Sequence, residues 1–208
     1  MRFACLALAA SLSALPAMPA PVEAPAFETV KRDGDLEIRR YAPTIVAETL
    51  VEGSLWSASN EGFRVIAGYI FGNNLSARGE GSEKVAMTAP VTTEPVSQKI
   101  AMTAPVTTEE EGARLRVQFT MPARYTLATL PRPLDPRVTL REVPARTVAV
   151  LRFSGLAFEG TVQEKTAALL AWVKAEGLAP AGTPQLARYD PPWTLPFLRR
   201  NEVMVPIR

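Results

Sequence analysis

The first pattern along the chain is an alternation of apolar and charged residues that starts at Leu36. Leu36, Ile38 and Arg40 alternate with charged residues, and side chains two positions apart share one face of a strand. A strand is therefore predicted here. After a turn at Pro43, residues 44–51 are apolar and β-branched, which predicts a second strand.

Apolar residues then recur at helical spacing as far as Gly72. Ser54 is a suitable N-cap, with Ser57 as a second candidate, and Gly72 with the two asparagines after it ends the segment. The apolar side chains cover too much of the circumference for one buried face, which indicates an apolar cleft beside the helix. These side chains are Trp56, Phe63, Val65, Ile66, Tyr69, Ile70 and Phe71.

A close tandem repeat follows the predicted helix. The segment Lys84–Glu94 recurs as Lys99–Glu109, and the single differing position holds a β-branched residue in both copies. A proline cannot donate to a sheet, so Pro90 and Pro105 are expected at an edge, a bulge or a strand end. The two copies are predicted to be neighbouring antiparallel strands, over residues 85–92 and 100–107.

The second half of the chain repeats the pattern of the first more weakly. The pattern of residues 36–53 recurs over residues 138–155, and a helical segment that closes at Gly177 follows it. A repeated strand–strand–helix–strand order is typical of an α+β domain with pseudo-twofold symmetry. Further strands are predicted at residues 115–119, 185–189 and 202–207.

Prolines at positions 131, 133 and 136 separate the two halves. The segment could be a linker between two domains. We interpret it as a stiff crossover within one domain, because each half alone is small for a stable core. The folded domain is predicted to cover residues 27–208 of the 208-residue chain.

Composition narrows the chemistry that the chain can perform. Apolar residues make up 47% of the chain and charged residues 21%, with a net charge of +2, which gives no reason to expect a nucleic acid partner. The sequence contains no histidine and one cysteine, Cys5. These absences exclude serine–histidine and cysteine–histidine nucleophiles, zinc sites of nitrogen and sulfur ligands, iron–sulfur clusters and histidine-ligated haem.

The N-terminus resembles an export signal. Arg2 supplies a positive charge, residues 3–15 are apolar, and residues 17–20 offer an A-x-A cleavage site. Pro21 disfavours cleavage directly before it, so Ala17 and Ala24 are rival sites. A retained membrane anchor is the alternative, although the apolar run is short for a span. We expect residues 1–24 to be signal peptide and lead-in, and the mature protein to be periplasmic or secreted without a membrane span.

Four parts of the chain carry motifs in a familiar order. They are residues 37–43, residues 68–72, the repeated Ala-Met-Thr-Ala-Pro-Val at 86–91 and 101–106, and residues 189–193 with 197–204. Together they resemble the signatures of the SOUL haem-binding family, and the doubled central motif resembles its bacterial, exported branch.

The resemblance implies a distorted antiparallel β-barrel or sheet with two helices, built from two similar halves. It also implies non-enzymatic binding of haem or related tetrapyrroles in an apolar cleft, for transport, storage or buffering. Some members are proposed to use a histidine ligand near the N-terminal signature. This chain has Arg39, Arg40 and Tyr41 there, so bound iron would take a tyrosine, a methionine or no protein ligand.

A tetrapyrrole is a flat apolar ring with two carboxylates, so its site needs an apolar cleft and one or two cations at the rim. The residues predicted to wall an apolar cleft are Trp56, Phe63, Ile66, Tyr69, Ile70, Trp193 and Phe197. The predicted partners of the haem propionates are Arg40, Arg64, Arg199 and Arg200. The candidate axial ligands are Tyr41, Tyr69, Met87 and Met102. Each has a structural alternative: a core aromatic or thioether, a solvated helix face, or internal pairing of an arginine with Glu202.

Two rival functions stay open. Glu61 and Tyr69 lie two helical turns apart and could serve as base and acid of a small-molecule hydrolase. The chain could instead bind another hydrophobic small molecule or a lipid in the periplasm, which needs an apolar cleft but no iron ligand. The favoured interpretation has no catalytic residue, no catalytic cofactor and no protein metal site.

Overall fold

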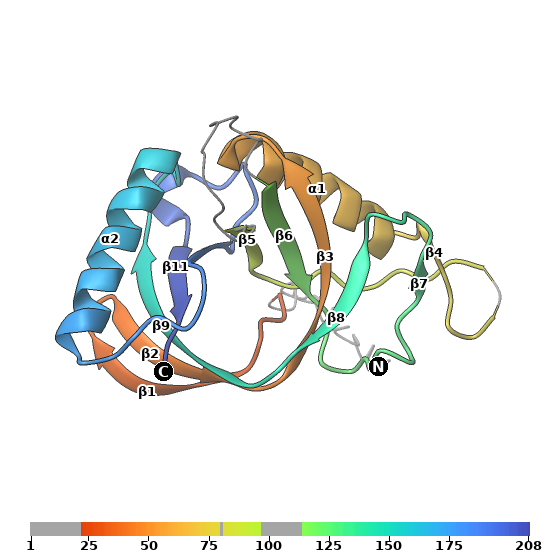
Figure 1. Ribbon diagram of the computed structural model, residues 1–208. Coiled ribbons are helices and arrows are strands. Elements are labelled where there is room, and N and C mark those ends of the chain that lie inside the picture. The colour runs from red at the N-terminus through yellow and green to blue at the C-terminus, as the bar shows by residue number, and fades with distance from the viewer. Residues whose placement is uncertain (1–21, 80, 97–113) are drawn as a thin grey trace, which may run out of the picture.

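The computed structural model describes residues 22–79, 81–96 and 114–208. In this part of the chain, nine strands form one antiparallel sheet, curled into a half-barrel, with α1 (Leu55–Ile70) and α2 (Glu159–Ala175) on its outside (Figure 1). The small ladder of β4 (Asn74–Leu75) and β7 (Arg132–Pro133) lies apart from this sheet. The strands of the large sheet are β1 (Phe27–Asp33), β2 (Leu36–Tyr41), β3 (Thr44–Glu52), β5 (Val91–Pro95), β6 (Arg114–Thr120), β8 (Thr139–Val143), β9 (Arg146–Phe153), β10 (Gln185–Arg188) and β11 (Asn201–Pro206).

The sheet has the pseudo-twofold symmetry predicted from the repeated pattern. Its order is β1-β2-β9-β11-β10-β5-β6-β3-β8, and the two halves meet where β10 pairs with β5, with Ala187 opposite Thr92. From this centre outwards, β10, β11, β9 and β2 correspond to β5, β6, β3 and β8. The α+β class and the distorted barrel architecture are therefore confirmed.

The two halves exchange their first strands. β2 pairs with β9 of the second half, with Ile38 opposite Ala149, whereas β8 pairs with β3 of the first half, with Leu140 opposite Ala47. Neither β2 nor β8 pairs with the strand that follows it in sequence. Each half therefore completes the sheet of the other.

The outer face of the sheet is apolar and packs against the helices. Ile66 of α1 packs in one cluster with Val117 of β6, and Leu169 of α2 packs in a second cluster with Val203 of β11. A Cβ atom on Gly62 would lie 2.5 Å from Val117 Cγ2, so the glycine is what allows α1 to approach β6. Burial of these clusters supplies the main favourable free energy of folding.

Most predicted elements lie where the pattern placed them. The side chain of Ser54 accepts from Ser57 N, so Ser54 is the N-cap of α1, and Gly72 has a φ of 122° just after that helix ends. Strands β2, β3, β6, β9, β10 and β11 all overlap predicted strands. The pattern missed β1, which is exposed along its whole length and therefore lacks the alternation of a half-buried strand.

The tandem repeat is only partly described. The strand expected over residues 85–92 begins at Val91, directly after Pro90, so this proline marks a strand end as predicted. Residues 85–90 form no ladder apart from one bridge between Thr88 and Glu23. The second copy, residues 99–109, lies outside the described residues, and the predicted pairing of the two copies stays a prediction.

Candidate functional site

The predicted ligand residues of α1 divide between its two faces. Ile66, Tyr69 and Ile70 are fully buried in the core against β6, so they are not available to a ligand at the surface in this structure. Trp56 and Phe63 are exposed, Trp56 to 60%, and the Phe63 ring packs in a tilted arrangement against Phe119, with 5.4 Å between the ring centroids. The apolar surplus predicted for this helix thus exists at Trp56 and Phe63.

The phenol groups are engaged in hydrogen bonds and are poor candidates for iron ligands. Tyr69 donates to Pro131 O at 2.9 Å, and Tyr189 donates to Glu202 at 2.7 Å. Tyr41 accepts from a buried guanidinium, and Tyr125 donates to a glutamate. Burial raises the pKa of Tyr41, Tyr69 and Tyr189, which disfavours the phenolate. Of the candidate thioethers, Met87 is partly exposed and Met102 lies outside the described residues.

The connection between β10 and β11 carries a run of exposed apolar side chains. Trp193 is 82% exposed and Phe197 is 70% exposed, and Leu195 and Leu198 between and beside them are exposed as well. Phe197 and Leu198 belong to η1 (Pro196–Leu198), and Trp193 and Leu195 precede it. Exposed side chains of this size, so close together, are typical of a binding surface rather than of ordinary protein surface.

Hydrogen bonds hold this connection in one shape. The guanidinium of Arg199 donates to Thr194 O at 2.7 Å and also to the carbonyl of Pro192. Asp190 accepts from Arg200 N at 2.6 Å, as expected for an aspartate that shapes a turn. The apolar side chains are therefore presented by a preformed loop, which lowers the conformational cost of binding.

Neighbouring elements extend the apolar run on both sides. Pro196 O accepts from Gly155 N at 2.9 Å, which places the loop beside the start of α2, where Leu156 and Phe158 are exposed. In Figure 1 the loop lies at the top of the molecule, between the first turns of α2 and α1. On the α1 side, the Arg188 guanidinium lies 5.9 Å from the centroid of the Trp56 ring. We call this region the apical apolar surface: Trp56, Leu156, Phe158, Trp193, Leu195, Phe197 and Leu198.

The four arginines predicted to pair with propionates differ in their surroundings. Arg40 forms an exposed ion pair with Glu28 at 2.9 Å, and Arg64 is exposed on α1. Arg199 holds the loop, and Arg200 pairs with Glu202 at 2.7 Å and stacks on Tyr189. The internal pairing of an arginine with Glu202, the structural alternative to propionate binding, is thus present for Arg200.

Sequence reasoning missed Arg188, which stands next to both Trp56 and the loop. One signal was present in the sequence. Arg188 follows Leu186 by two positions at the end of a predicted strand, so both side chains share the outer, apolar face of the sheet. A cation at the end of an apolar face, directly before the family motif at residues 189–193, is a candidate ligand contact.

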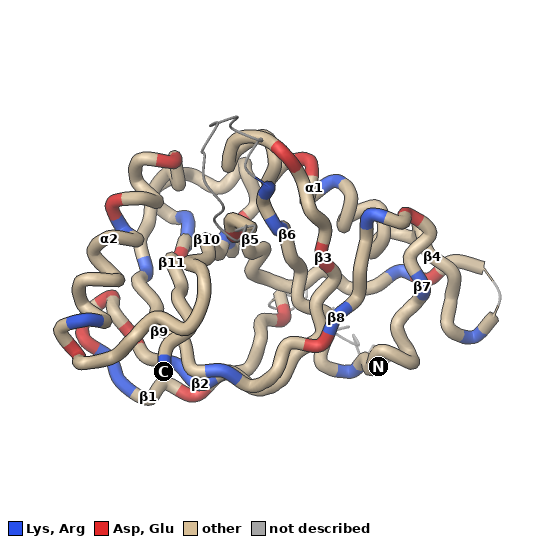
Figure 2. Tube along the Cα trace, in the orientation of Figure 1, with Lys and Arg blue, Asp and Glu red and all other residues tan. Residues whose placement is uncertain are grey.

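The inner face of the sheet carries buried charges. Arg39 is fully buried and donates to Glu37 at 2.6 Å and to Glu202 at 2.8 Å. Farther along the sheet, Arg116 pairs with Glu94 at 2.6 Å. Figure 2 shows such charged residues on strands in the middle of the sheet as well as at its edges. Buried apolar side chains, among them Val148, Val150 and Met204, pack beside these charges. The inner face is therefore occupied by packed and ion-paired side chains, which makes it a poor site for a porphyrin ring.

This inner network also contains a glutamate–tyrosine pair, Glu202 with Tyr189. Burial opposes the charge on Glu202, but hydrogen bonds from Arg39 and Tyr189 outweigh it and lower the pKa of the carboxyl. A carboxylate held by two guanidinium groups and a phenol is a weak general base. The pair therefore resembles a structural ion network more than a catalytic one.

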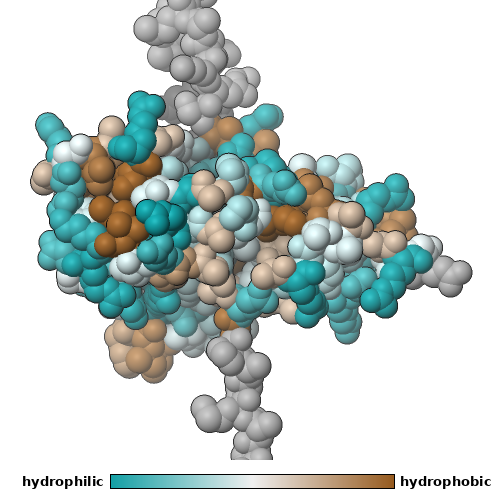
Figure 3. All heavy atoms as spheres, turned by 90° about the horizontal axis from the view of Figure 1, so that it is seen from below, coloured by the Kyte–Doolittle hydropathy of each residue, from teal (hydrophilic) through white to brown (hydrophobic). Residues whose placement is uncertain are grey.

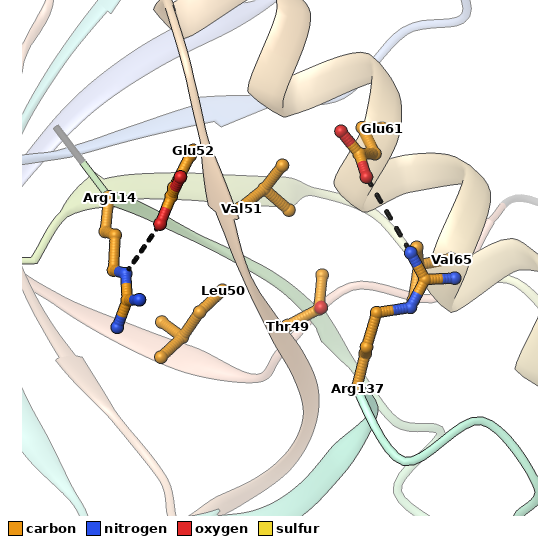
Figure 4. Close-up of a pocket in the computed structure, with 8 residues that line it drawn as sticks. All are labelled: Thr49, Leu50, Val51, Glu52, Glu61, Val65, Arg114 and Arg137. Carbon is orange, nitrogen blue, oxygen red and sulfur yellow. Dashed lines mark hydrogen bonds and ion pairs between the residues drawn. The ribbon is translucent and has the colours of Figure 1, made fainter. Parts of the chain in front are cut away.

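The rival catalytic pair on α1 is not assembled. Tyr69 is buried, whereas Glu61 is half exposed and faces Arg137 at 3.7 Å. Glu61 lines a cavity of about 430 Å³ between β3 and α1, with Arg114 and Glu52 paired on its other side (Figure 4). A second cavity, of about 660 Å³, lies between residues 23–26 and the turns at 42–45 and 142–144.

Neither of these two cavities is lined by a predicted ligand residue. On the face shown in Figure 3, seen from below, apolar side chains gather in separate groups bordered by polar ones. Within residues 22–79, 81–96 and 114–208, no group of three or more acidic or cysteine side chains is placed to hold a metal ion. The apical apolar surface is therefore the candidate ligand site that agrees best with the sequence predictions.

Comparison with known families assigns both halves of the molecule to the same family. The family model of the SOUL heme-binding protein matches residues 22–98 and again residues 93–206. The chain belongs to this family, as its motifs predicted. No curated protein matches the chain. No helix of the described segments is long and apolar enough to cross a membrane.

Solved structures agree on the fold at low sequence identity. The C-terminal domain of EcmrR is 12% identical with a TM-score of 0.59, and the match covers 83% of this chain and 96% of that domain. A hydrolase from Listeria innocua is 13% identical with a TM-score of 0.55, covering 86% and 94% of the two chains. At such identities the similarity concerns the fold alone.

Proposed function

We propose that this protein binds haem or a related tetrapyrrole on the apical apolar surface, without catalysis, and serves in its transport, storage or buffering. Membership of the SOUL family is the observation that carries the proposal, and the family binds haem. The exposed and preformed loop with Trp193 and Phe197 supports the location. Trp56, Trp193 and Phe197 were all predicted from the sequence as ligand contacts, and all three are exposed, which also supports the location.

The chemistry of the surface determines the strength of binding. A porphyrin face buried against apolar side chains gains roughly 25 cal/mol for each Å² removed from water. The loss of translational and rotational freedom offsets a large part of this gain. Without a histidine or an available phenolate, no strong bond to iron adds to it. We therefore propose a Kd on the order of micromolar rather than nanomolar.

Hemin and metal-free protoporphyrin IX are expected to bind with Kd values within about tenfold of each other. The reason is that both present the same apolar ring to the surface, and iron gains no strong protein ligand. Absorbance and tryptophan-fluorescence titrations of the same preparation with both compounds measure this. Tyr69→Phe is the matched control and should leave both Kd values unchanged, because the Tyr69 phenol is buried and bound to Pro131 O.

An iron ligand would show itself in the same titrations. If hemin bound at least about a hundredfold more tightly than protoporphyrin, and Met87→Leu abolished that difference, axial ligation by Met87 would replace the present proposal.

A second candidate ligand is another hydrophobic small molecule or a lipid. The hydrogen bonds made by the described phenols favour this candidate. Because these phenols are not free to bind iron, the surface offers a ligand apolar contact but no iron ligand. Native mass spectrometry of protein purified from the exporting cell identifies the bound molecule. A lipid at unit stoichiometry in place of a tetrapyrrole would favour this candidate.

We further propose that the protein is exported and that a signal peptide within residues 1–24 is cleaved, which leaves a short lead-in before the folded domain. The positive Arg2, the apolar run and the A-x-A site support export. N-terminal sequencing of the mature protein should give a start between Met18 and Phe27. Replacing Leu6 and Leu8 with arginine should abolish processing, because both interrupt the apolar run. Recovery of the wild-type chain from the cytoplasm with Met1 intact would contradict export.

A further inference from the structure

Arg188 lies at the junction of the two halves of the sheet, next to the first turn of α1. It is the last residue of β10, opposite Val91 of β5, and therefore stands at the centre of the pseudo-twofold sheet. Its guanidinium lies 5.9 Å from the ring centroid of Trp56, at the first turn of α1. Its neighbour on the other side is Arg199, which holds the apolar loop.

The charge of Arg188 is poorly compensated. Burial is the main reason that its pKa is lowered, and repulsion by Arg199 adds to the effect. Within the described part of the chain, its guanidinium has no ion pair and no hydrogen bond to a carboxylate. The nearby acids serve other partners: Asp190 binds the Arg200 amide, and Glu202 binds Arg39 and Arg200.

Most buried or half-buried arginines of the sheet have a carboxylate partner, whereas Arg146, which also lacks one, donates instead to the side chain of Gln185. Arg39 has two glutamates, Arg116 has Glu94, and Arg200 has Glu202. A desolvated guanidinium without an anion is unfavourable, and a carboxylate is the partner with which it forms two parallel hydrogen bonds. The face of Trp56 beside it suits a flat apolar ring carrying that carboxylate.

We propose that Arg188 and Trp56 form the carboxylate-binding end of the ligand site, with the ring of the ligand extending from Trp56 over the apolar loop at 193–198. The inference rests on the proposed function and narrows it. The ligand is then a planar apolar molecule with a free carboxylate, such as a porphyrin with ionised propionates, rather than a neutral hydrophobic compound. Arg188 acts through a direct contact with the ligand, whereas Arg199 positions the loop.

Protoporphyrin IX and its dimethyl ester test this assignment. The ester replaces both carboxylates by neutral methyl esters, so it loses their charge and gains two methyl groups, and neither compound contains iron. Fluorescence titrations of the full-length mature protein should show that the wild type binds the free acid at least tenfold more tightly than the ester. Arg188→Gln should bind both with the affinity that the wild type shows for the ester. Arg188→Lys should keep part of the preference, because the charge remains but the bidentate geometry is lost.

Two controls separate ligand contact from a structural role. Arg78→Gln removes an exposed arginine of the loop that follows α1 and should leave the preference for the free acid intact. Arg188→Gln should unfold in urea at the same or a higher denaturant concentration than the wild type, since it removes a desolvated cation without breaking an ion pair among the described residues. A clear loss of stability in Arg188→Gln would show that the residue has a structural partner, and would overturn the assignment.

The possible failures are distinguishable. If the wild type binds acid and ester equally, and Arg188→Gln changes neither, tetrapyrrole binding stands and the carboxylate site at Arg188 is refuted. If the wild type binds neither compound up to about a hundred times the micromolar Kd proposed above, the proposed function fails and the carboxylate site fails with it.

Discussion

Replacing Arg39 with methionine is expected to lower the free energy of unfolding by roughly 3–5 kcal/mol. The guanidinium of Arg39 lies between Glu37 and Glu202, and both carboxylates are buried with it on the inner face of the sheet. Methionine preserves much of the volume but leaves the two carboxylates without their shared cation. Removing one partner of a buried ion pair costs far more than the intact pair contributes.

Urea unfolding followed by circular dichroism measures the change. The matched control is Arg40→Met, one position along the same strand. Arg40 and Glu28 form an ion pair with more than half of each side chain exposed, so the control should lose about 1 kcal/mol or less. A loss below about 1 kcal/mol for Arg39→Met would show that water or a rearranged Arg200 compensates the carboxylates, and would refute this account of the inner network.

Replacing Trp193 and Phe197 together with serine is expected to weaken hemin binding at least a hundredfold. The two side chains are the most exposed large apolar groups of the loop and would be buried by a porphyrin face. Losing the burial of each costs about 1.5–3 kcal/mol, or about 3 kcal/mol or more for the pair. Because aromatic side chains dominate such contacts, this double variant should affect affinity more than any other change on the apical apolar surface.

The control for this variant is Phe71→Ser. Phe71 is exposed to 58%, but it follows the C-terminal end of α1, whereas the apical apolar surface adjoins the first turn of that helix. This control should bind hemin like the wild type, and both variants should unfold close to the wild-type midpoint because the replaced side chains are exposed. Unchanged hemin affinity in the double variant would place the ligand site elsewhere on the molecule.

The sequence predicted the fold well because most strands have two unlike faces. In β2, Ile38 packs towards α2 while Arg39 enters the inner network, and this produces the alternation that marks a strand. β6 shows the same arrangement, with Val117 on the outer face and Gln118 on the inner face. β1 has neither face buried, so no alternation could reveal it.

The site could be predicted only in part. The spacing on α1 showed too many apolar residues for one buried face, but it could not tell which of them the core would take. The close approach of α1 to β6 at Gly62 buries Ile66 and Tyr69 and leaves Trp56 outside. Propionate partners were predicted from arginines inside the motifs. The roles of Arg199 and Arg200 depend on contacts with Thr194 O and Glu202 that only the folded chain brings together.

The exchange of first strands between the halves has a consequence for how the chain assembles. Because β2 completes the second half and β8 completes the first, the ladders that join the halves link residues far apart in the sequence. Such a topology has a high contact order, and its ladders form late and together rather than one half after the other. A break in the crossover at residues 131–136 would not release two independent modules. It would leave two fragments that fold only by complementing each other.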